Sequence, residues 1–330
     1  MSPLLEVENL TVEIATRRGP LTAIADVSFS IGRGEILGVV GESGAGKSLT
    51  GTAILGLLDR PVRQTGGSVR LSGLRIDGLG EDGLRSIRGR RIGAVFQDPM
   101  ASLNPLLTVG RQIVQTIRTH LDLSDKAAED KAAALLAEVG VPAARERLDA
   151  YPHELSGGLR QRIVLALAFA CDPELVIADE PTTALDVSVQ AQVIEVLRRM
   201  GRERGTSVLL ITHDMGVIAD AADRLAVMYA GRLVEIGPVR SILGHPSHPY
   251  TRGLMASIPS MRRRGVDLPQ IEGAMPRLGE IAPGCAFAPR CPVRLPRCAI
   301  DRPSLAHAEG SLAACWLVPD RTAMPLRAAS

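Results

Sequence analysis

The sequence predicts an α/β fold in which a parallel sheet carries helices on both faces. Three apolar runs are typical of buried strands: Ile36 to Val40, Leu175 to Asp179, and Ser207 to Thr212. Between the last two, apolar residues recur at helical spacing from Val189 to Met200. Strands that alternate with helices in this way are typical of a parallel sheet, because each return to the same edge needs a crossover helix.

The order of the predicted elements divides the chain into a main domain and an extension. Short strand-like runs occupy Leu4 to Phe96, and a mainly helical region follows at about 98–170. Strands and helices then alternate again, so we expect one domain over 1–237 that contains a helical subdomain. Beyond that domain the periodicity fades and Pro, Arg and Cys become frequent. We therefore expect a small Cys-containing C-terminal extension over 238–330.

Two helices can be placed within this outline. Leu49 to Leu58 follows a Gly-rich turn and is helix-like. Ala127 to Val139 is rich in Ala and Leu and stops at Gly140, with Pro142 just beyond, which is a normal helix exit.

Composition narrows the function classes. The 330 residues include 38 Lys and Arg against 36 Asp and Glu, a balance that gives no general case for nucleic-acid binding. Met1 to Leu10 lacks the basic flank and apolar run of a secretion signal. Apolar stretches such as Ile163 to Cys171 are well short of the ~20 residues that span a bilayer. We expect a cytoplasmic chain, with any membrane spans supplied by another chain.

The most specific chemical motif is the run Gly41-Glu-Ser-Gly-Ala-Gly-Lys-Ser48, which fits the phosphate-binding loop G-x-x-x-x-G-K-[ST]. Its glycines allow backbone N–H groups to surround phosphate oxygens, Lys47 supplies a cation, and Ser48 offers a hydroxyl to Mg²⁺. The helix that follows directs the positive end of its dipole at the anion. A flexible Gly-rich turn is the alternative, and the flanking strand and helix argue against it. The residues expected to bind nucleotide are Gly41, Glu42, Ser43, Gly44, Ala45, Gly46, Lys47, Ser48 and Leu49.

A second motif is the apolar strand that ends in Asp179 and Glu180. In enzymes with a phosphate-binding loop, an acid in this place holds Mg²⁺. Glu180 is then placed to polarise a water for attack on the γ-phosphate. Alone, such a strand end is a weak signal; together with the loop around Lys47 it becomes specific.

A third motif points to a family. The run Leu155-Ser-Gly-Gly-Leu-Arg-Gln161 resembles the LSGGQ signature of ABC ATPases and lies shortly before the acidic strand, as it does there. Gln97 resembles the family's Q-loop glutamine, Ala184-Leu-Asp186 resembles the D-loop, and His213 resembles the switch histidine. Each piece alone is weak. Their shared order and spacing carry the resemblance over about Leu4 to Gly237.

The resemblance implies an ABC-type nucleotide-binding domain, with a RecA-like core, a β-subdomain and a helical subdomain. In that family two domains close head to tail around ATP. It follows that the signature residues of this chain contact ATP held by a partner subunit: Ser156, Gly157, Gly158 and Leu159. The implied catalytic residues are Glu180, His213 and Gln97, and the implied Mg²⁺ ligands are Ser48, Gln97 and Asp179.

Two positions depart from the family pattern. Leu159 stands where Gln is commonest, although a hydrophobic residue is familiar there in peptide-importer ATPases. The adenine-stacking position aligns with Ile14, where many members carry an aromatic residue. The resemblance therefore implies aliphatic contact with adenine and weaker stacking.

The subfamily follows from four longer runs. Gln97 to Pro105, Glu180 to Gln190, His245 to Arg252 and Gly284 to Pro292 look like the oligopeptide/dipeptide importer ATPases, and more like the first of their two paired subunits. Members take up peptides, and some take up nickel complexes or sugars.

This likeness implies several partners. They are a second, related ATPase subunit (a homodimer stays open), two membrane permeases and an extracytoplasmic solute-binding protein, with no nucleic acid. It places the chain peripherally at the cytoplasmic face of the inner membrane, and the segment Met100 to Leu106 against the permeases.

Other functions in the same family remain as alternatives. ABC ATPases of DNA repair carry a long coiled coil between loop and signature, whereas only about a hundred residues separate Ser48 from Leu155 here. Translation factors usually carry two cassettes in one chain. A regulatory nucleotide-binding module would be expected to lose Glu180 or His213, and both are present.

Four of the five cysteines fall in one C-terminal window: Cys285, Cys291, Cys298 and Cys315. Stable disulfides are rare in the cytoplasm, and four thiolates suit either structural Zn²⁺ or an iron–sulfur cluster. The gaps of five, six and sixteen residues lack the close C-x₂-C pairs of zinc ribbons. Resemblance to peptide-importer ATPases favours a 4Fe–4S cluster, with zinc as the alternative. We expect Cys171, which stands apart, to be buried in the core.

Overall fold

The computed structural model describes residues 2–183, 185–257 and 270–318. The chain divides into two compact units. Unit 1 contains Met1–Ile31, Leu37–Asp77 and Thr212–Ser330, and unit 2 contains Gly32–Ile36 and Gly78–Ile211. Among the described residues, no helix has both the length and the apolar character needed to cross a membrane.

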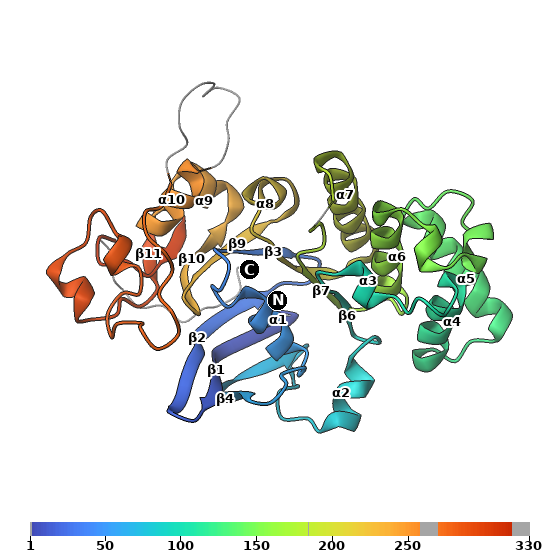
Figure 1. The fold of residues 1–330 in the computed structure, drawn as a ribbon, viewed down its shortest axis with the longest axis horizontal. Coiled ribbons are helices and arrows are strands. Elements are labelled where there is room, and N and C mark those ends of the chain that lie inside the picture. Colours follow the sequence, from blue (N-terminus) through green and yellow to red (C-terminus); the bar gives the residue numbers. More distant parts are fainter. Residues whose placement is uncertain (1, 184, 258–269, 319–330) are drawn as a thin grey trace. The chain divides into compact units, whose positions relative to one another are not determined.

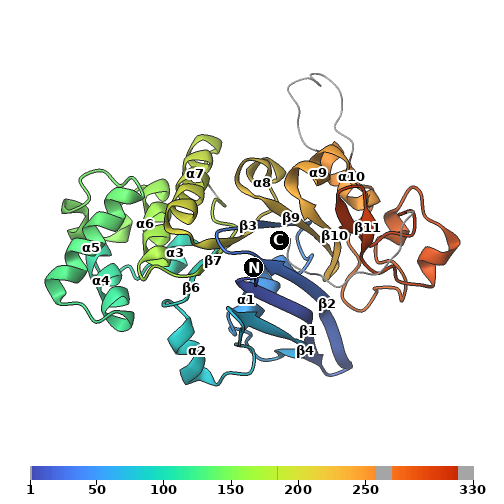
Figure 2. The same cartoon turned by 180° about the vertical axis from the view of Figure 1, so that it is seen from behind.

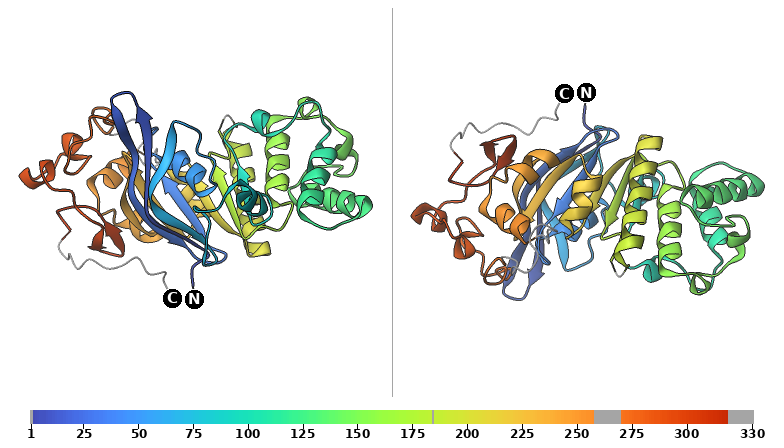
Figure 3. Two further views of the ribbon diagram at one scale, coloured as in Figure 1. Left: turned by 90° about the horizontal axis from the view of Figure 1, so that it is seen from below. Right: turned by 90° about the horizontal axis from the view of Figure 1, so that it is seen from above.

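The N-terminal part of unit 1 is a four-stranded antiparallel sheet in the order β2-β1-β4-β5. Its first strands alternate in burial, with Leu5 and Val7 of β1 buried and Glu8 exposed, as expected for a sheet that covers a core with one face. The left view of Figure 3 shows β1 and β2 running side by side. The strands are β1 (Leu5–Thr16), β2 (Gly19–Ile31), β4 (Val62–Leu71) and β5 (Leu74–Arg75).

A second group of strands in unit 1 follows the order β11-β12-β10-β9-β3. The pair β3 and β9 is parallel, and the other neighbours are antiparallel. All five residues of β3 are buried, which explains why this strand is a continuous apolar run in the sequence. The strands are β3 (Ile36–Val40), β9 (Arg224–Tyr229), β10 (Arg232–Pro238), β11 (Ala306–Ala308) and β12 (Ser311–Ala313).

Four α-helices and two short 3₁₀ turns complete the described part of unit 1. Helix α9 packs beside β9 and β10, as the view from behind shows (Figure 2). The helices are α1 (Lys47–Ile54), α8 (Met215–Ala221), α9 (Val239–Gly244) and α10 (Pro249–Ala256), and the turns are η3 (Ala288–Arg290) and η4 (Pro296–Ala299).

Unit 2 combines three parallel strands with a helical region. Strand β7 pairs with β6 and with β8, and both pairs are parallel. Helices α4, α5 and α6 lie against one another (Figure 1). The strands are β6 (Ile92–Val95), β7 (Leu175–Asp179) and β8 (Ser207–Ile211). The helices are α2 (Glu81–Ile87), α3 (Pro99–Ser102), α4 (Val109–His120), α5 (Asp125–Glu138), α6 (Gly157–Phe169) and α7 (Val187–Arg204), with turns η1 (Glu146–Asp149) and η2 (Pro152–Glu154).

Local sequence explains where the helices of unit 2 begin. Thr108, Ser124, Ser156 and Asp186 precede α4, α5, α6 and α7, and each side chain accepts a hydrogen bond from a backbone N–H of the first turn. Helix α7 ends at Gly205, whose left-handed conformation closes the last turn.

The predicted α/β class is confirmed, and several predicted elements are found within a residue of their bounds. The strands expected at 36–40 and 175–179 are β3 and β7, and the strand expected at 207–212 is β8. The helix expected over Leu49–Leu58 is shorter and shifted, because α1 starts at Lys47 and ends at Ile54, where the backbone turns. Cys171 is buried at 1% exposure, as predicted.

The C-terminal extension has more regular structure than its fading periodicity suggests. It begins with α9 and α10, and its hairpin β11-β12 continues the strands of unit 1 by pairing with β10. The carboxylate of Glu235 on β10 is fully buried and accepts hydrogen bonds from Ser247 N, His248 N and Ser311 Oγ. Strand β10 therefore gives the extension both a pairing partner for its hairpin and a buried hydrogen-bond acceptor. Neither contact can be read from the sequence pattern of the extension.

Candidate functional site

The loop between β3 and α1 has a backbone that only glycine fits at several positions. Gly44 and Gly46 adopt left-handed conformations, with φ of +84° and +97°. A Cβ on Gly41 would lie 2.3 Å from the carbonyl oxygen of Met228 on β9. The predicted phosphate loop is thus present as a tight turn that packs against the neighbouring strand.

Lys47 is folded into this loop. Its side chain is only 7% exposed, and Nζ donates hydrogen bonds to the carbonyl oxygens of Gly41 (2.8 Å) and Glu42 (3.2 Å). Ala45 is buried, Ser43 and Ser48 are exposed, and α1 starts immediately behind the loop. A cation, a hydroxyl and the positive end of a helix are therefore gathered within a few residues, which is the chemistry of anion binding.

Two further predicted residues lie in unit 1. Ile14 is on β1, where it pairs with Leu21 of β2 and Val62 of β4, and it is partly exposed. His213 is exposed and is the second residue after the end of β8. Asp214 then caps α8 by accepting a hydrogen bond from Gly216 N at 2.7 Å, so the backbone next to His213 is fixed.

The acidic pair lies at the end of β7 in unit 2. Asp179 is the last residue of the strand, and Glu180 adopts a left-handed conformation with φ of +49°. Glu180 N donates to Ile211 O at 2.8 Å, and Thr183 Oγ1 donates to the Glu180 carboxylate at 3.4 Å. A glutamate with positive φ is uncommon, and strained backbone of this kind clusters at functional sites.

Gln97 and the segment after it are at the surface of unit 2. Gln97 is exposed and lies between β6 and α3. In the predicted permease-contact segment Met100–Leu106, the side chain of Met100 lies outside the described part, whereas Leu106 is 83% exposed. Phe96, next to Gln97, is 45% exposed. Two large apolar side chains therefore face outward close to the predicted Q-loop.

The signature segment forms the start of α6. Ser156 is its N-cap and accepts a hydrogen bond from Leu159 N at 3.4 Å, and both Ser156 and Gly157 are exposed. A Cβ on Gly158 would lie 2.7 Å from Cγ1 of Val189 on α7. The segment therefore offers a hydroxyl and bare backbone outward while its inner side packs on α7.

The D-loop prediction is only partly covered by the structure. Ala184 lies outside the described residues. Leu185 is described, and its Cδ2 would be 3.5 Å from a Cβ on Gly157. Asp186 caps α7 through Val189 N at 2.9 Å. The described part of the D-loop is thus adjacent to the signature within unit 2.

The predicted residues divide between the units. The loop 41–49, Ile14 and His213 belong to unit 1, and Gln97, the signature, Asp179 and Glu180 belong to unit 2. Within each unit the geometry suits the predicted chemistry.

Contacts between the loop and the extension were missed by sequence reasoning. The Arg290 guanidinium pairs with the Glu42 carboxylate at 2.8 Å, and Glu42 N donates to the hydroxyl of Tyr250 at 2.8 Å. Both partners lie in runs, His245–Arg252 and Gly284–Pro292, that served only to identify a subfamily. A carboxylate inside an anion-binding loop is the one signal that would have prompted a search for a buried cation.

The four clustered cysteines line one small pocket of unit 1 together with Trp316. Burial first, and then the neighbouring thiols, raise the pKa of Cys285 to about 11. Over residues 2–183, 185–257 and 270–318, however, no three side chains of His, Cys, Asp or Glu are grouped as a site for a metal ion. The predicted 4Fe–4S or zinc site is therefore not supported by the arrangement of these thiols alone. The residues concerned are Cys285, Cys291, Cys298 and Cys315.

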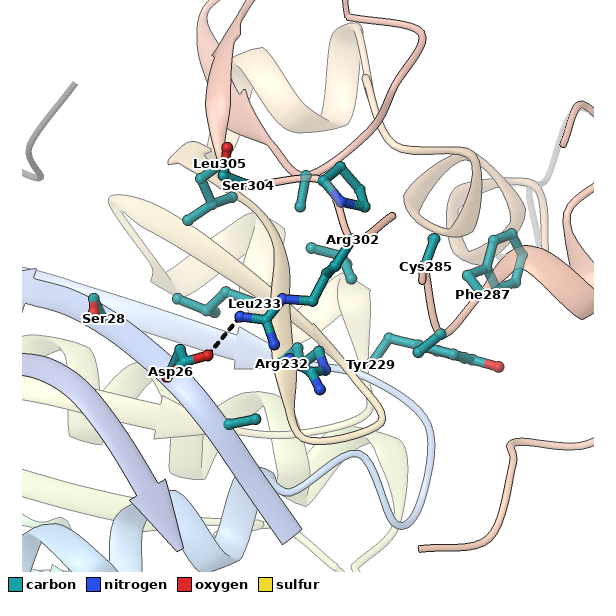
Figure 4. A pocket seen from close by; sticks show the side chains of 15 residues that line it. Asp26, Ser28, Tyr229, Arg232, Leu233, Cys285, Phe287, Arg302, Ser304 and Leu305 are labelled. Atoms are coloured by element: carbon teal, nitrogen blue, oxygen red, sulfur yellow. Dashed lines mark hydrogen bonds and ion pairs between the residues drawn. The ribbon is translucent and has the colours of Figure 1, made fainter. Parts of the chain in front are cut away.

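A second cavity of unit 1, about 350 Å³ in volume, lies between the strands and the extension. Figure 4 shows Arg302 of the extension reaching Asp26 of β2 across it. This ion pair also ties the extension to the strands of unit 1, through β2 and not through the phosphate loop.

Comparison with known proteins shows the family to which the chain belongs. The ABC transporter family profile matches residues 24–183, and the profile of the oligopeptide/dipeptide transporter C-terminal region matches residues 234–298. The dipeptide transport ATP-binding protein DppD of Bacillus subtilis is 45% identical over 323 residues, which are 97% of this chain and 96% of that protein. The oligopeptide transport ATP-binding protein AppD of the same organism is 43% identical over 329 residues, or 98% and 99% of the two chains.

A solved structure shares the fold. The ATP-binding cassette MJ0796, determined as a dimer in a post-hydrolysis state with ADP and Pi, is 27% identical with a TM-score of 0.65. The match covers 72% of this chain and 99% of the cassette. The chain therefore belongs to the ABC transporter ATP-binding proteins, and within them to the group that carries the oligopeptide/dipeptide transporter C-terminal region.

Proposed function

We propose that this chain is the ATP-hydrolysing subunit of an importer for di- or oligopeptides. The observation that carries the proposal is the preformed phosphate loop, with Lys47 folded onto the loop carbonyls at the start of α1. The chain aligns with DppD and AppD over nearly their full lengths, at 45% and 43% identity, and this similarity supports peptides as the cargo class. The substrate itself is recognised by other subunits, so this chain supplies the energy and not the selectivity.

The proposed chemistry is hydrolysis of the γ-phosphate by positioning and charge neutralisation. Lys47 and the loop N–H groups hold the phosphates, and Ile14 contacts adenine. Ser48, Gln97 and Asp179 would hold Mg²⁺, which would neutralise charge on the phosphates. Glu180 accepts the proton of the attacking water. His213 stabilises the phosphoryl oxygens.

The proposed active form is a pair of ATPase subunits closed head to tail. Ser156, Gly157, Gly158 and Leu159 would complete the site of the partner, and the exposure of Ser156 and Gly157 suits that role. Because each site then needs two chains, the isolated subunit should be a poor ATPase. The dimeric state of MJ0796 supports this assembly. A related but different ATPase is the proposed partner, and a homodimer would serve the same chemistry.

Glu180→Gln tests the hydrolytic assignment in the assembled transporter. Without the base, turnover should fall by about 10²- to 10⁴-fold, the usual contribution of a positioned general base. ATP binding should persist, because the amide keeps the size of the side chain and adds no charge. ATPase rate and nucleotide affinity are measured on the same sample. Near-normal turnover by the variant would rule out Glu180 as the base.

The proposed permease contact is the segment after Gln97, where Leu106 is 83% exposed. Leu106 and Phe96 are both large apolar side chains exposed on unit 2, and side chains of this kind suit burial against another chain. Leu106→Ser should reduce peptide uptake several-fold while the basal ATPase rate of the complex changes little. Equal loss of uptake and hydrolysis, or no loss of either, would place the contact elsewhere.

We also propose that the four C-terminal cysteines hold a 4Fe–4S cluster. Support comes from the pocket that all four thiols line together with Trp316. A cluster, being larger than a single ion, takes ligands that stand farther apart, which is compatible with thiols that are not grouped for one ion. The group would pin a Pro-rich tail that has little core of its own. Zinc remains the alternative.

Metal content decides between these alternatives. Protein purified without oxygen should be brown, with broad absorption near about 400 nm and about four irons per chain. Colourless protein with one equivalent of zinc would favour the alternative. Protein with neither metal would refute both.

A further inference from the structure

We propose that Arg290 of the C-terminal extension is a positioning residue of the phosphate loop, and that it raises nucleotide affinity by neutralising Glu42. The inference rests on the proposed binding of ATP at this loop. It goes beyond that proposal by giving the extension a part in the nucleotide site.

The contact joins residues 248 positions apart in the sequence. Arg290 Nη1 lies 2.8 Å from the Glu42 carboxylate, and their side chains are only 7% and 28% exposed. The guanidinium also donates to the carbonyl oxygens of Glu272 (2.9 Å) and Ile271 (3.2 Å), and to the hydroxyl of Tyr229 (3.3 Å). A guanidinium fixed by several acceptors has little freedom, so its charge is held at one place beside the loop.

A second bond holds the backbone of the same residue. Glu42 N donates to the hydroxyl of Tyr250 at 2.8 Å, and Tyr250 is fully buried. The N–H of Glu42 is therefore engaged by a side chain of the extension. Both the side chain and the backbone of Glu42 are thus fixed by residues of the extension.

Aromatic packing makes this support rigid. The ring centroids of Tyr229 and Tyr250 are 4.7 Å apart, and Phe287 lies 5.3 Å from Tyr229 and 5.4 Å from Tyr250. The whole chain has only three Tyr and four Phe, so gathering three of them under one loop is a marked concentration. Edge-to-face rings resist displacement, because they fill the space with stiff side chains.

Electrostatics explains why the pair affects nucleotide binding. Glu42 places a carboxylate in a loop whose other polar groups attract a polyphosphate. Unpaired, that charge would repel the nucleotide, and partial burial would limit screening by water. Paired with Arg290, it contributes little net field and its oxygens cannot turn toward the phosphates. Removing the arginine alone should therefore be worse than removing both charges.

The chain offers a matched control. Arg302 also belongs to the extension and pairs with Asp26 of β2, away from the phosphate loop. Loss of either arginine removes one tie between the extension and the strands of unit 1. Only loss of Arg290 leaves an unpaired acid in the phosphate loop.

The experiment measures Mg-ATP affinity of the purified full-length chain and KM and kcat of the assembled transporter. The variants are R290Q, R290K, E42Q, the double variant E42Q/R290Q, and R302Q. We expect R290Q to weaken Mg-ATP binding about tenfold, within the range typical of coupling between sites. The double variant should return to the affinity of E42Q, R290K should fall between R290Q and wild type, and R302Q should bind as wild type. KM should rise in R290Q with little change in kcat, since the chemistry of the γ-phosphate is untouched.

Two outcomes would overturn this inference and leave the proposed function standing. One is an R290Q variant that binds Mg-ATP as tightly as wild type. The other is a double variant as weak as R290Q, because a purely structural role of Arg290 gives no rescue when the acid is removed. Should R290Q fail to fold, the comparison of R290K with E42Q/R290Q still tests the rescue. A wild-type chain that binds no Mg-ATP would overturn the proposed function first, and this inference with it.

Discussion

The phosphate loop of unit 1 and the signature segment of unit 2 are built in opposite ways. The loop is enclosed by its own chain: Lys47 is 7% exposed and bonded to loop carbonyls, and Glu42 is held by Arg290 and Tyr250. The signature is open, with Ser156 and Gly157 exposed at the start of α6.

In the proposed pair of ATPase subunits, this difference divides the work of a shared site between the two chains. A loop that is already ordered before the nucleotide binds loses its conformational entropy during folding, so little further entropy is lost on binding. A signature that completes another chain's site must leave its polar groups unburied until the two chains close. Three predictions test whether this contrast is real.

The largest change in nucleotide affinity is expected from a substitution in the phosphate loop. Lys47→Ala removes the buried cation that we propose as a phosphate ligand, so Mg-ATP affinity of the isolated chain should fall on the order of 100-fold, the range for hydrogen bonds to charged groups. Titration of the purified chain with a fluorescent ATP analogue measures this.

Lys131→Ala serves as the control for Lys47→Ala. It removes a lysine that pairs with Asp172 at the surface of unit 2, and it should leave affinity unchanged. Wild-type affinity in the Lys47 variant would mean that the loop is not the phosphate site.

A substitution in the signature segment should change turnover of the ATPase pair and leave the nucleotide affinity of the isolated chain unchanged. Gly157→Ala adds a methyl group that, among the described residues, meets Leu185 Cδ2 at 3.5 Å, an ordinary contact, so folding and the isolated chain's own affinity should be unchanged. Turnover of the ATPase pair should fall about tenfold, because the methyl group stands where the partner's nucleotide must approach.

Gly80→Ala is the control, since a Cβ there meets no atom of the described part of the chain within 4 Å. ATPase rates of the reconstituted pair, with affinities measured on single chains, separate the two effects. If Gly157→Ala weakened binding by the isolated chain, the division of labour between the two regions would be contradicted.

The smallest expected effect is on folding stability, through His248, which caps α10 beside Tyr250. His248 is 1% exposed, and its Nδ1 accepts a hydrogen bond from Tyr250 N at 3.1 Å, which requires the neutral ring. Burial, and then Arg252, lower its pKa from 6.5 to about 3, and Glu235 accepts its backbone N–H. Because the folded pKa lies below the unfolded value, this stability is complete above pH 6.5 and is lost as pH falls toward 3. The slope is up to about 1.4 kcal/mol per pH unit.

Urea unfolding at pH 7.5, 6.5 and 5.5 measures the effect of His248. His248→Asn keeps a side-chain acceptor for the helix cap but does not titrate, so its stability should depend less on pH over this range. Parallel pH profiles for the two proteins would show that the buried imidazole does not contribute.

Sequence reasoning worked best where one local pattern carries the information. The loop 41–48, the strand that ends at Asp179 and the cap at Ser156 are each set by neighbours a few residues away, and their conformations follow from glycine freedom, strand periodicity and capping. The order of these pieces was enough to predict the fold class and the family.

Sequence reasoning failed where the contacting residues lie far apart in the sequence. Nothing near Glu42 indicates Arg290, and nothing near Ala313 indicates that it pairs with Glu235 of β10. The fading periodicity after Pro238 reflects a segment whose partners lie elsewhere in unit 1. Such a segment gets its order from the surface it packs on, so its own pattern is a poor guide to its structure.

The hairpin β11-β12 has a further consequence, for solubility. It covers β10, which would otherwise be the open edge of its group of strands, and β10 carries buried apolar residues such as Leu233, Val234 and Ile236. Exposed edges of this kind pair with other chains. A protein shortened to end at Gly237 would present that edge with its strand donors and acceptors unmatched, and it should self-associate into β-rich aggregates even though every motif for ATP is retained.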